Sequence, residues 1–360
     1  HPVIKQNPEW KTDLYLPDGS LNTEKWDEYR LTTWFDTFLP TLNLEITEVT
    51  EMLSDSAVYW IETYGMDGFR HDATKHIPLK FWRTLTKKLK ENVVEKENRK
   101  LYQIGETYGS PGLISAYLGS GMLDAQFDFN VYDATLATIA RGDVDFTILK
   151  DRLMQSFDYY GYHHLMGNIT GNQDRGRFVS YASGDLKFGE DAKLAGWTRD
   201  IGVGDPSGYN KLRLLIAFNM TVPGIPVIYY GDEIGMPGGN DPDNRRMMRF
   251  TSLNEEELET RETTAYLAKL RRQHLEFIYG DFITVHEQNG VFSYARKYFE
   301  KEALVVLNNN GSEIEIEIVL PGALEMKKTE GHFGHAYELN ADKLLVTLPP
   351  YSFEIITSGK

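Results

Sequence analysis

Hydrophobic residues follow two different spacings along the first 280 positions of the chain. In some stretches they recur every three or four residues, as on the buried face of an amphipathic helix. Between these stretches lie short apolar runs bounded by glycine, proline or charged residues, which favour buried strands. The alternation of strand and helix predicts a parallel sheet. Helices are predicted at 48–64, 79–94, 148–159, 211–220 and 255–280, and strands at 68–72, 101–106, 123–129, 164–174 and 221–233.

The pattern changes after Asp281 to short runs in which apolar and polar residues alternate, which is typical of antiparallel strands. Residues 1–47 show neither spacing. We therefore predict three regions: an irregular segment at 1–47, a strand–helix region at 48–280 and a small β domain at 281–360. The strands predicted in the β domain are Val291–Ala295, Ala303–Leu307, Ile314–Val319, Leu344–Leu348 and Phe353–Ile356.

The irregular segment is unusually aromatic for a stretch without regular structure. A long excursion of this kind packs on the rest of a domain and can cover a site. Aromatic rings stack on sugar faces, but we expect buried packing for most of these side chains. The aromatic residues concerned are Trp10, Trp26, Tyr29, Trp34, Phe35 and Phe38.

Composition narrows the classes of function. With 360 residues the chain exceeds the size at which one core usually divides, so two domains are expected. Its 38 basic and 53 acidic side chains give a formal net charge of −15, which disfavours a nucleic-acid partner but leaves neutral substrates such as sugars open. No apolar run approaches the roughly 20 residues of a membrane span. The absence of cysteine excludes disulfides and thiolate metal sites without deciding the compartment.

Three acidic residues follow strand-like runs. Arg70 and Asp72 alternate with His71, so they are expected to share one face of their strand. A carboxylate held beside a guanidinium stays ionised, as a nucleophile or an electrostatic stabiliser must; a structural ion pair at a strand end is the alternative. Glu106 and Asp174 end two further runs. Acids at the ends of successive strands are the layout of a (β/α)-barrel active site.

Several separate motifs together resemble the α-amylase superfamily of glycoside hydrolases, most closely its neopullulanase and cyclomaltodextrinase branch. The motifs lie along essentially the whole chain. They are Gly68-Phe69-Arg70-His71-Asp72-Ala73-Thr74-Lys75-His76, Gly105-Glu106-Thr107-Tyr108, Gly171-Asn172-Gln173-Asp174, Leu39-Pro40-Thr41-Leu42-Asn43, Gly224-Ile225-Pro226-Val227-Ile228-Tyr229-Tyr230-Gly231-Asp232-Glu233 and Gly238-Gly239-Asn240-Asp241-Pro242-Asp243-Asn244-Arg245-Arg246.

The resemblance implies catalytic roles for the three acids. Asp72 would be the nucleophile, Glu106 the general acid and then base, and Asp174 the stabiliser of the transition state. Arg70 would orient Asp72. Because the motif of Glu106 contains no arginine, we expect this carboxyl group to keep its proton more readily.

The resemblance also implies substrate-binding residues. Lys75 and His76 would line the side of the leaving group. Gln173 stands with Asn172 where the family usually has Asn-His, so it can donate to a sugar hydroxyl but cannot carry a charge. A glucosyl unit would be held by Asp241 and Arg245. Asp243 fits a capped turn nearly as well, and Asp232 and Glu233 would be structural.

The implied fold is α/β: a (β/α)8 TIM barrel, of which strands four to eight are present, followed by a C-terminal antiparallel β-sandwich. Residues 1–47 would be the remainder of loop domain B after strand three, 48–280 the catalytic barrel and 281–360 the sandwich. The family's motif at the end of strand three is absent. We therefore expect either a fragment of a longer protein or a barrel completed by another chain, which leaves a homo-oligomer open.

The implied activity is that of a retaining hydrolase of α-1,4-glucosidic bonds in maltooligosaccharides, cyclodextrins, pullulan or starch. Two alternatives stay open: an α-glucan transglycosylase, and an inactive fragment or non-catalytic barrel used for carbohydrate binding or assembly. The expected partners are α-glucan oligosaccharides, with no nucleic acid and no membrane span. No cofactor is required, calcium binding is left open, and both the cytoplasm and the periplasm of a bacterium fit the sequence.

Overall fold

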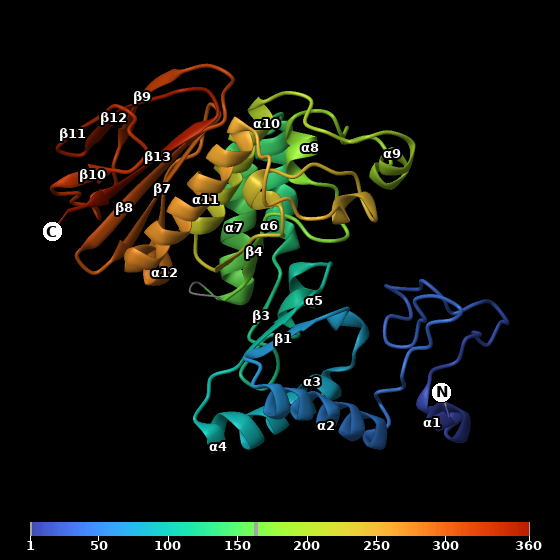
Figure 1. Ribbon diagram of the computed structural model, residues 1–360. Helices are drawn as coiled ribbons and strands as arrows, with labels where there is room; N and C mark the ends of the chain where they lie inside the picture. Colours follow the sequence, from blue (N-terminus) through green and yellow to red (C-terminus); the bar gives the residue numbers. More distant parts are fainter. Residues whose placement is uncertain (1, 162–164, 360) are drawn as a thin grey trace. The chain divides into compact units, whose positions relative to one another are not determined.

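The computed structural model describes residues 2–161 and 165–359. The chain forms two compact units, unit 1 at residues 1–127 and unit 2 at residues 128–360 (Figure 1). Among the described residues, five short parallel strands, β1 to β5, precede the last long helix, and the remaining strands are antiparallel. This agrees with the predicted change of pattern near Asp281.

Unit 1 contains a parallel sheet in the order β1-β2-β3, with α2 and α3 packed together beside it. Its core includes Val49, Ile61, Trp82 and Leu85, all nearly inaccessible, from the apolar faces that predicted the two helices. The elements of unit 1 are α1 (Pro2–Gln6), η1 (Pro8–Trp10), α2 (Thr47–Tyr64), β1 (Gly68–His71), η2 (Thr74–His76), α3 (Leu79–Leu89), the π-helical turn η3 (Lys90–Val94), α4 (Glu95–Glu97), β2 (Tyr102–Gly105), α5 (Pro111–Ser115) and β3 (Ala125–Gln126).

A glycine lets β1 and β2 approach at the start of their pairing. Gly68 has a φ of 150°, and a Cβ atom there would lie 1.8 Å from the carbonyl oxygen of Tyr102. Only glycine fits this close backbone approach. The pairing then runs in register from Gly68 opposite Tyr102 to His71 opposite Gly105, so the carboxyl ends of the two strands are level.

The aromatic residues of the irregular segment before α2 differ in how far they are buried. Trp10 and Trp34 are buried, and the indole N–H of Trp34 donates to the carbonyl oxygen of Thr12 at 3.1 Å. Trp26, Phe35 and Phe38 are exposed instead. Tyr29 is half-buried. Two of the six rings are buried, so the expectation of buried packing for most of them is wrong.

Unit 2 begins with helices and the two-stranded parallel sheet β4–β5. The predicted strand at 123–129 is too long, because Asp128 accepts a hydrogen bond from the backbone N–H of Val131 and caps a helix that starts at Phe129. The start of the run predicted at 164–174 lies outside the described residues. The elements are α6 (Phe129–Thr135), the π-helical turn η4 (Leu136–Arg141), α7 (Phe146–Tyr160), β4 (Gly167–Ile169), α8 (Phe178–Ala182), α9 (Ala192–Thr198), α10 (Ser207–Thr221), β5 (Ile225–Val227), η5 (Asp232–Ile234) and η6 (Asp243–Arg245).

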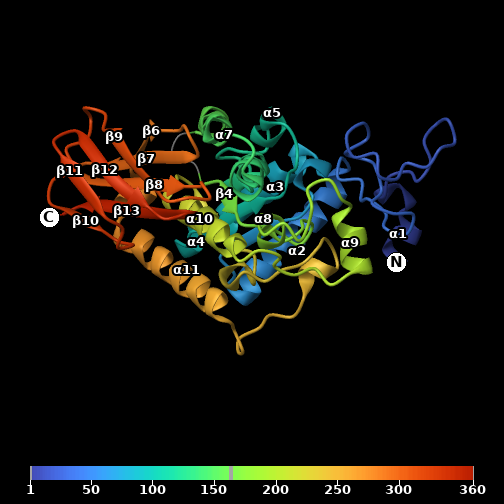
Figure 2. The same ribbon diagram turned by 90° about the horizontal axis from the view of Figure 1, so that it is seen from above.

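The rest of unit 2 is a helix pair followed by two antiparallel sheets, orange to red in Figures 1 and 2. A capping box of Asn254 and Glu257 starts the first helix, and the single helix predicted at 255–280 is interrupted at His274. The elements are α11 (Glu255–Gln273), α12 (Leu275–Tyr279), β6 (Asp281–His286), β7 (Val291–Tyr298), β8 (Lys301–Asn308), β9 (Ile314–Val319), β10 (Thr329–Gly331), β11 (Tyr337–Asn340), β12 (Lys343–Leu348) and β13 (Ser352–Ser358).

The two sheets pack face to face as a β-sandwich. Their strand orders are β10-β13-β8-β7-β6 and β11-β12-β9. Val306 and Ile356 from the first sheet share a core with Ile318 and Val346 from the second. All five predicted strands are present, whereas β6, β10 and β11 had not been predicted.

A buried carboxylate fixes one loop of the sandwich. The side chain of Glu354 on β13 is fully inaccessible and accepts backbone N–H groups from His332, Phe333 and Ile355 on one oxygen and from His335 on the other, at 2.8–2.9 Å. Charge-assisted hydrogen bonds of this kind are stronger than neutral ones. One carboxylate therefore anchors the backbone N–H groups of His332, Phe333 and His335.

Glu354→Gln is expected to lower the free energy of unfolding by about 2–4 kcal/mol, because the new amide group can accept on one side only and leaves a buried N–H unpaired. Urea denaturation of the 360-residue chain measures the change. Glu338→Gln on β11 is the matched control, since Glu338 is exposed. Equal stability of the two variants would contradict the assigned role of Glu354.

Candidate active site

Asp72 directly follows β1, and Arg70 lies on the strand itself. Arg70 Nη1 lies 3.0 Å from Asp72 Oδ1. The prediction that these two side chains share one face is therefore confirmed.

Glu106 directly follows β2 and is held beside Asp72 by the backbone. Its N–H donates to the carbonyl oxygen of His71 and to Thr74 Oγ1, both at 3.0 Å, and its own carbonyl oxygen accepts from the N–H of Thr74 at 2.9 Å. These bonds continue the β1–β2 register past the ends of the strands. The two carboxyl groups thus come to the same edge of the sheet, as the carboxyl ends of parallel strands do.

Arg70 also binds Glu106. Its Nη2 lies 2.6 Å from Glu106 Oε2, so one guanidinium bridges both carboxyl groups. The motif of Glu106 contains no arginine of its own, but the register between β1 and β2 brings Arg70 beside it, and the two-pronged guanidinium reaches both carboxyl groups. The expectation that Glu106 keeps its proton more readily stays a prediction.

The surroundings of Asp72 favour its ionised form. Burial acts to raise the pKa of Asp72, but a side-chain hydrogen bond with Glu106 and the charge and hydrogen bond of Arg70 outweigh it, and the pKa lies below its ordinary value. Asp72 is therefore held as an anion beside the carboxyl group of Glu106, with the Arg70 guanidinium in contact with both.

Lys75 and His76 lie on η2, shortly after Asp72, and both contact the irregular N-terminal segment. Lys75 Nζ donates to the carbonyl oxygen of Tyr108 at 3.1 Å and lies 3.5 Å from Asp27 Oδ1. His76 Nδ1 donates to the carbonyl oxygen of Arg30 at 2.8 Å. Burial lowers the pKa of His76, so its imidazole is neutral at pH 7.

In unit 2, Asp174 lies in the loop between β4 and α8. Its backbone N–H donates to Asn172 Oδ1 at 3.0 Å, and Gln173 Nε2 donates to Asp174 Oδ2 at 3.0 Å. Arg245 Nη2 donates to Asp174 Oδ1 at 3.1 Å, and Arg245 Nε lies 2.9 Å from Asp241 Oδ1. The structure thus brings together the five residues that the sequence selects in this unit.

Asn244 holds this loop in place and was missed by the sequence analysis. Its Nδ2 is buried and lies within hydrogen-bond distance of the carbonyl oxygens of Asn172, Gln173 and Arg175, at 3.3, 2.8 and 2.8 Å. In the sequence, Asn244 lies in a loop rich in Gly, Pro, Asp and Asn, where an asparagine is an ordinary turn residue. Its role depends on the fold, which brings residues some seventy positions apart into contact.

Beneath the loop lies a buried ion pair. Arg177 Nη1 is 2.8 Å from Asp232 Oδ1, and Thr170 Oγ1 donates to Asp232 Oδ2 at 2.6 Å. Arg177 Nε also donates to the carbonyl oxygen of Asn244 at 3.0 Å. The structural role expected for Asp232 agrees with these contacts, which connect the ends of β4 and β5.

Asp243 is likewise a turn residue. It accepts the N–H of Gly239 at 2.7 Å and both Nε and Nη2 of Arg246, at 2.8 and 2.9 Å. The carboxylate of Asp243 therefore makes its hydrogen bonds within its own loop. Arg245, in contrast, contacts both Asp241 and Asp174.

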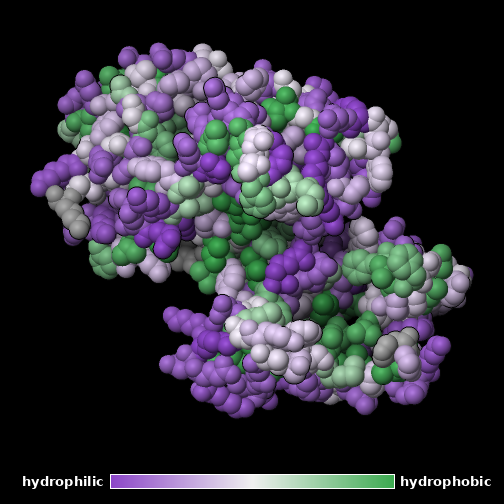
Figure 3. All heavy atoms as spheres, viewed as in Figure 1, coloured by the Kyte–Doolittle hydropathy of each residue, from purple (hydrophilic) through white to green (hydrophobic). Residues whose placement is uncertain are grey.

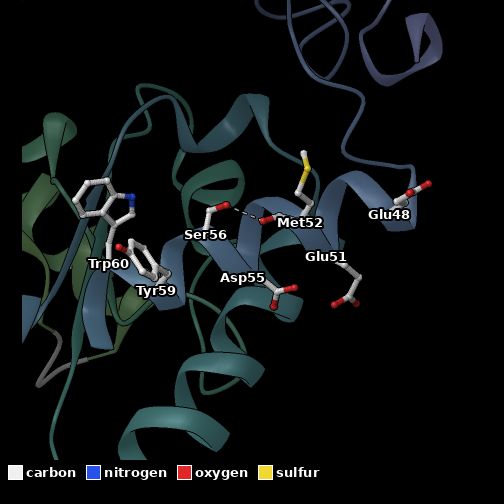
Figure 4. Close-up of a pocket in the computed structure, with 7 residues that line it drawn as sticks. All are labelled: Glu48, Glu51, Met52, Asp55, Ser56, Tyr59 and Trp60. Atoms are coloured by element: carbon white, nitrogen blue, oxygen red, sulfur yellow. Dashed lines mark hydrogen bonds between the residues drawn. The ribbon is translucent and has the colours of Figure 1, made fainter. Parts of the chain in front are cut away.

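A separate surface hollow of about 860 Å³ lies on α2 and is shown in Figure 4. No predicted site residue lines it. The lining side chains are Glu48, Glu51, Met52, Asp55, Ser56, Tyr59 and Trp60. Lys88 Nζ from α3 pairs with both Glu51 and Asp55, so part of this acidic surface is already neutralised.

Two further observations concern metals and membranes. Within residues 2–161 and 165–359, no group of three or more histidine, cysteine, aspartate or glutamate side chains is arranged to hold a metal ion, and calcium binding stays open. None of the helices in the same described ranges combines the length and the hydrophobicity that crossing a bilayer requires.

Two family models match the chain. The model described as the catalytic domain of α-amylase matches residues 9–276, and that of the C-terminal domain of maltogenic amylase matches residues 282–355. Among curated proteins, a cyclomaltodextrinase of Geobacillus thermopakistaniensis is 29% identical over 96% of this chain and 53% of its own length. Neopullulanase 2 of Thermoactinomyces vulgaris is 26% identical over 89% of this chain and 50% of its own length. The chain therefore spans about half the length of these relatives.

Solved structures agree with the family models. The crystal structure of an α-amylase from Geobacillus thermoleovorans, in complex with acarbose, has a TM-score of 0.81 and 25% identity, covering 100% of this chain and 74% of that one. The α-amylase of Anoxybacillus has a TM-score of 0.80 at 25% identity, covering 100% and 73%. The predicted fold class is confirmed: the fold of an α-amylase catalytic (β/α) barrel domain, followed by a C-terminal antiparallel β-sandwich.

Proposed function

The chain belongs to the α-amylase family of glycoside hydrolases, and we propose that it carries the catalytic residues of a retaining hydrolase of α-1,4-glucosidic bonds. Asp72 is the nucleophile, Glu106 the acid and base, and Asp174 the stabiliser of the transition state. The contacts within each unit support these roles. Residues 1–47, 48–280 and 281–360 are proposed as the remainder of domain B, the barrel and the sandwich, which fits the ranges of the two family matches.

In the first step a carboxylate oxygen of Asp72 attacks the anomeric carbon of a bound glucosyl unit. The bond between this carbon and the glycosidic oxygen breaks, and Glu106 gives its proton to the leaving oxygen. In the second step Glu106 takes a proton from water, which attacks the same carbon and releases Asp72. Two inversions at one carbon retain the α configuration.

The bridging of Asp72 and Glu106 by Arg70 is the observation that carries the proposal. An inverting enzyme needs two carboxyl groups far enough apart for a water molecule to stand between sugar and base, whereas a retaining enzyme needs them close together. Carboxyl groups that bind one guanidinium at 3.0 and 2.6 Å are close together. The same guanidinium keeps the attacking carboxylate ionised.

We propose that Asp174 and its neighbours bind the glucosyl unit and stabilise its transition state. A carboxylate can accept hydroxyl groups whose hydrogen bonds strengthen as the ring flattens towards an oxocarbenium ion. Arg245 and Gln173 both contact this carboxylate and hold it in one orientation. We propose Asn172, Gln173, Asp241 and Arg245 as contacts to the glucosyl unit, and Lys75 and His76 as contacts on the leaving-group side.

The proposed substrates are maltooligosaccharides, cyclodextrins, pullulan or starch, since the similar proteins include a cyclomaltodextrinase and a neopullulanase. A transglycosylase uses the same three acids with a sugar in place of water. A non-catalytic glucan-binding protein is the remaining alternative, against which the presence of Asp72, Glu106 and Asp174 argues.

The proposal is tested by incubating the 360-residue chain with maltoheptaose and with β-cyclodextrin. Reducing sugar and the anomer formed first, observed by proton NMR, are measured. We expect α-anomeric products that Asp72→Ala abolishes. A β-anomer would show inversion and contradict the mechanism, products longer than the substrate would identify a transglycosylase, and binding without product would favour the non-catalytic protein.

A further inference from the structure

We propose that the α9 segment, defined as residues 184–202, fixes the position of the loop at 238–246, with Gly196 as the positioning residue between them. Residues 238–246 are named the glucosyl loop, because they include Asp241 and Arg245, the proposed contacts to the glucosyl unit. The inference therefore rests on the proposed function. The α9 segment would set how tightly the chain holds a maltooligosaccharide. Both parts belong to unit 2.

The backbone of α9 touches the glucosyl loop at two glycines. Figures 1 and 2 show α9 beside the yellow to orange loop that precedes α11. A Cβ atom on Gly239 would lie 2.6 Å from the carbonyl oxygen of Ala192 and 3.1 Å from the backbone nitrogen of Gly196. A Cβ atom on Gly196 would lie 2.7 Å from that of Asp243. Neither glycine has a positive φ, so glycine is needed at both positions for space and not for its conformational freedom.

Gly196 also stands where helix formation disfavours it. The helix has seven residues, Ala192–Thr198, and glycine inside a helix is destabilising relative to alanine. Elsewhere on α9, Leu194 and Trp197 are 59% and 69% exposed. Figure 3 shows hydrophobic side chains scattered among hydrophilic ones on the surface of unit 2, so such exposure is ordinary there. The close contact with the glucosyl loop, rather than the exposed side of the helix, accounts for the glycine.

The α9 segment is bonded to the glucosyl loop on both sides of the sugar contacts. The carbonyl oxygen of Ala192 accepts the N–H of Asn240, which directly precedes Asp241, at 2.9 Å. At the other end of the loop, Arg246 Nη2 lies 3.3 Å from Asp200 Oδ1. Exposed ion pairs of this kind contribute little, so the backbone hydrogen bond is the stronger attachment.

A buried serine of α8 binds both parts. Ser180 Oγ accepts the N–H of Gly238 at 3.0 Å and donates to the carbonyl oxygen of Gly202 at 3.1 Å. The side chain of Ser180 is inaccessible to solvent, so water does not compete for these two hydrogen bonds. The first residue of the glucosyl loop and the last residue of the α9 segment are therefore held by one hydroxyl group.

The α9 segment has a small core of its own. Leu186, Ala195 and Ile201 are buried against one another. Asp191 caps α9 by accepting two N–H groups of its first turn, at 2.9 and 3.1 Å. Because the segment is held internally, its contact with the glucosyl loop has a defined position.

The contact at Gly196 reaches the sugar contacts through Asp243. This residue lies two positions from Asp241 and two from Arg245. Arg245 contacts Asp241 at 2.9 Å and Asp174 at 3.1 Å. Asp174 also accepts a hydrogen bond from Gln173 Nε2, which does not belong to the glucosyl loop. A displaced Asp243 would therefore shift Asp241 and Arg245 first, and would weaken sugar binding more than it alters the stabiliser.

The test measures binding in a chain that does not consume its ligand. Dissociation constants for maltoheptaose are determined by calorimetry in the Glu106→Gln background. Adding Gly196→Ala is expected to weaken binding about tenfold, as loss of one hydrogen bond to a charged group does. Helix propensity alone predicts no loss, because alanine favours a helix more than glycine does. Gly189→Ala is the matched control, since a Cβ atom on Gly189 of the same segment would meet no described atom within 4 Å.

A double substitution shows whether Gly196 acts through the glucosyl loop. When Arg245→Ala is already present, Gly196→Ala should weaken binding by less than about twofold, because the contact that it disturbs is gone. With Glu106 intact, Gly196→Ala should raise KM for maltoheptaose and change kcat by less than about threefold. Ser180→Ala, which adds no atoms, should weaken binding in the same direction as Gly196→Ala.

Equal binding by the Gly196→Ala and Gly189→Ala chains would overturn the proposal, as would additive effects of Gly196→Ala and Arg245→Ala. A lower kcat at unchanged KM would also contradict it, because Gly196 would then act on the chemical step. If Gly196→Ala fails to fold, Ser180→Ala decides between the same outcomes. A background chain that does not bind maltoheptaose overturns the inference too. Hydrolysis by the unmodified chain decides the proposed function separately, so failure of the inference leaves that function standing.

Discussion

Asp72→Ala is expected to lower kcat/KM for maltoheptaose by at least about 10⁴-fold, the scale seen when a residue that forms a covalent intermediate is removed. Without this carboxylate no glycosyl-enzyme forms, and neither Glu106 nor Asp174 can take over the attack. Initial rates of reducing-sugar release measure the loss. Asp67→Ala is the matched control, since Asp67 is exposed and precedes the same strand. Comparable rates for the two variants would remove Asp72 from the mechanism.

Glu106→Gln should impair the same reaction for a different reason, because it removes the proton donor and keeps the nucleophile. The effect is therefore expected to depend on the leaving group. Maltoheptaose requires protonation of its glycosidic oxygen, whereas fluoride leaves without a proton. The first step with α-glucosyl fluoride should thus be much less affected than that with maltoheptaose, a pattern that Asp72→Ala cannot produce.

Arg70→Ala carries the second-largest expected effect, a loss of about 10²–10³-fold in kcat/KM, comparable to removal of a strong electrostatic contact in an active site. Arg70 counteracts the rise in the pKa of Asp72 that burial causes. Without the guanidinium the pKa of Asp72 rises, and since the nucleophile must be ionised, the acid limb of the pH profile should move to higher pH. The pH dependence of kcat/KM measures this shift.

Arg70→Lys helps to separate charge from geometry. A lysine restores one positive charge but cannot reach both carboxyl groups with a fixed fork. We expect the acid limb of Arg70→Lys to move less than that of Arg70→Ala. Its kcat/KM should nevertheless stay well below that of the unmodified chain. Arg83→Ala on α3 is the control, because Arg83 is an exposed arginine of the same unit. An acid limb that stays in place in Arg70→Ala would contradict the assigned electrostatic role.

Local patterns in the sequence predicted the elements that bring acids to the site. The helix at 48–64 is α2, and the strand at 68–72 is β1 with Asp72 just beyond its end. The spacing of apolar residues along one element is a local property, so it can be followed without knowing the fold. The same holds for the alternating strands of the sandwich, whose inward faces are apolar.

Contacts between elements could not be predicted in this way. The bridge from Arg70 to Glu106 depends on the register of two strands, and the hold of Asn244 on the Asp174 loop joins residues far apart in the sequence. The sequence also does not separate exposed Trp26 from buried Trp34, since both belong to one aromatic segment without a period. Strand register, contacts between distant residues and the exposure of a side chain are set by the folded arrangement of the elements.

The central claim is that Asp72 forms a covalent bond to the sugar, and a direct measurement tests it. The chain is incubated with a fluorinated α-glucosyl fluoride, whose glycosyl-enzyme hydrolyses slowly, and its peptides are examined by mass spectrometry. We predict that the peptide containing Asp72 gains the mass of one fluorinated glucosyl group, and that Asp72→Ala remains unlabelled. A label on Glu106, or an unlabelled chain that still releases α-anomeric product, would contradict the account.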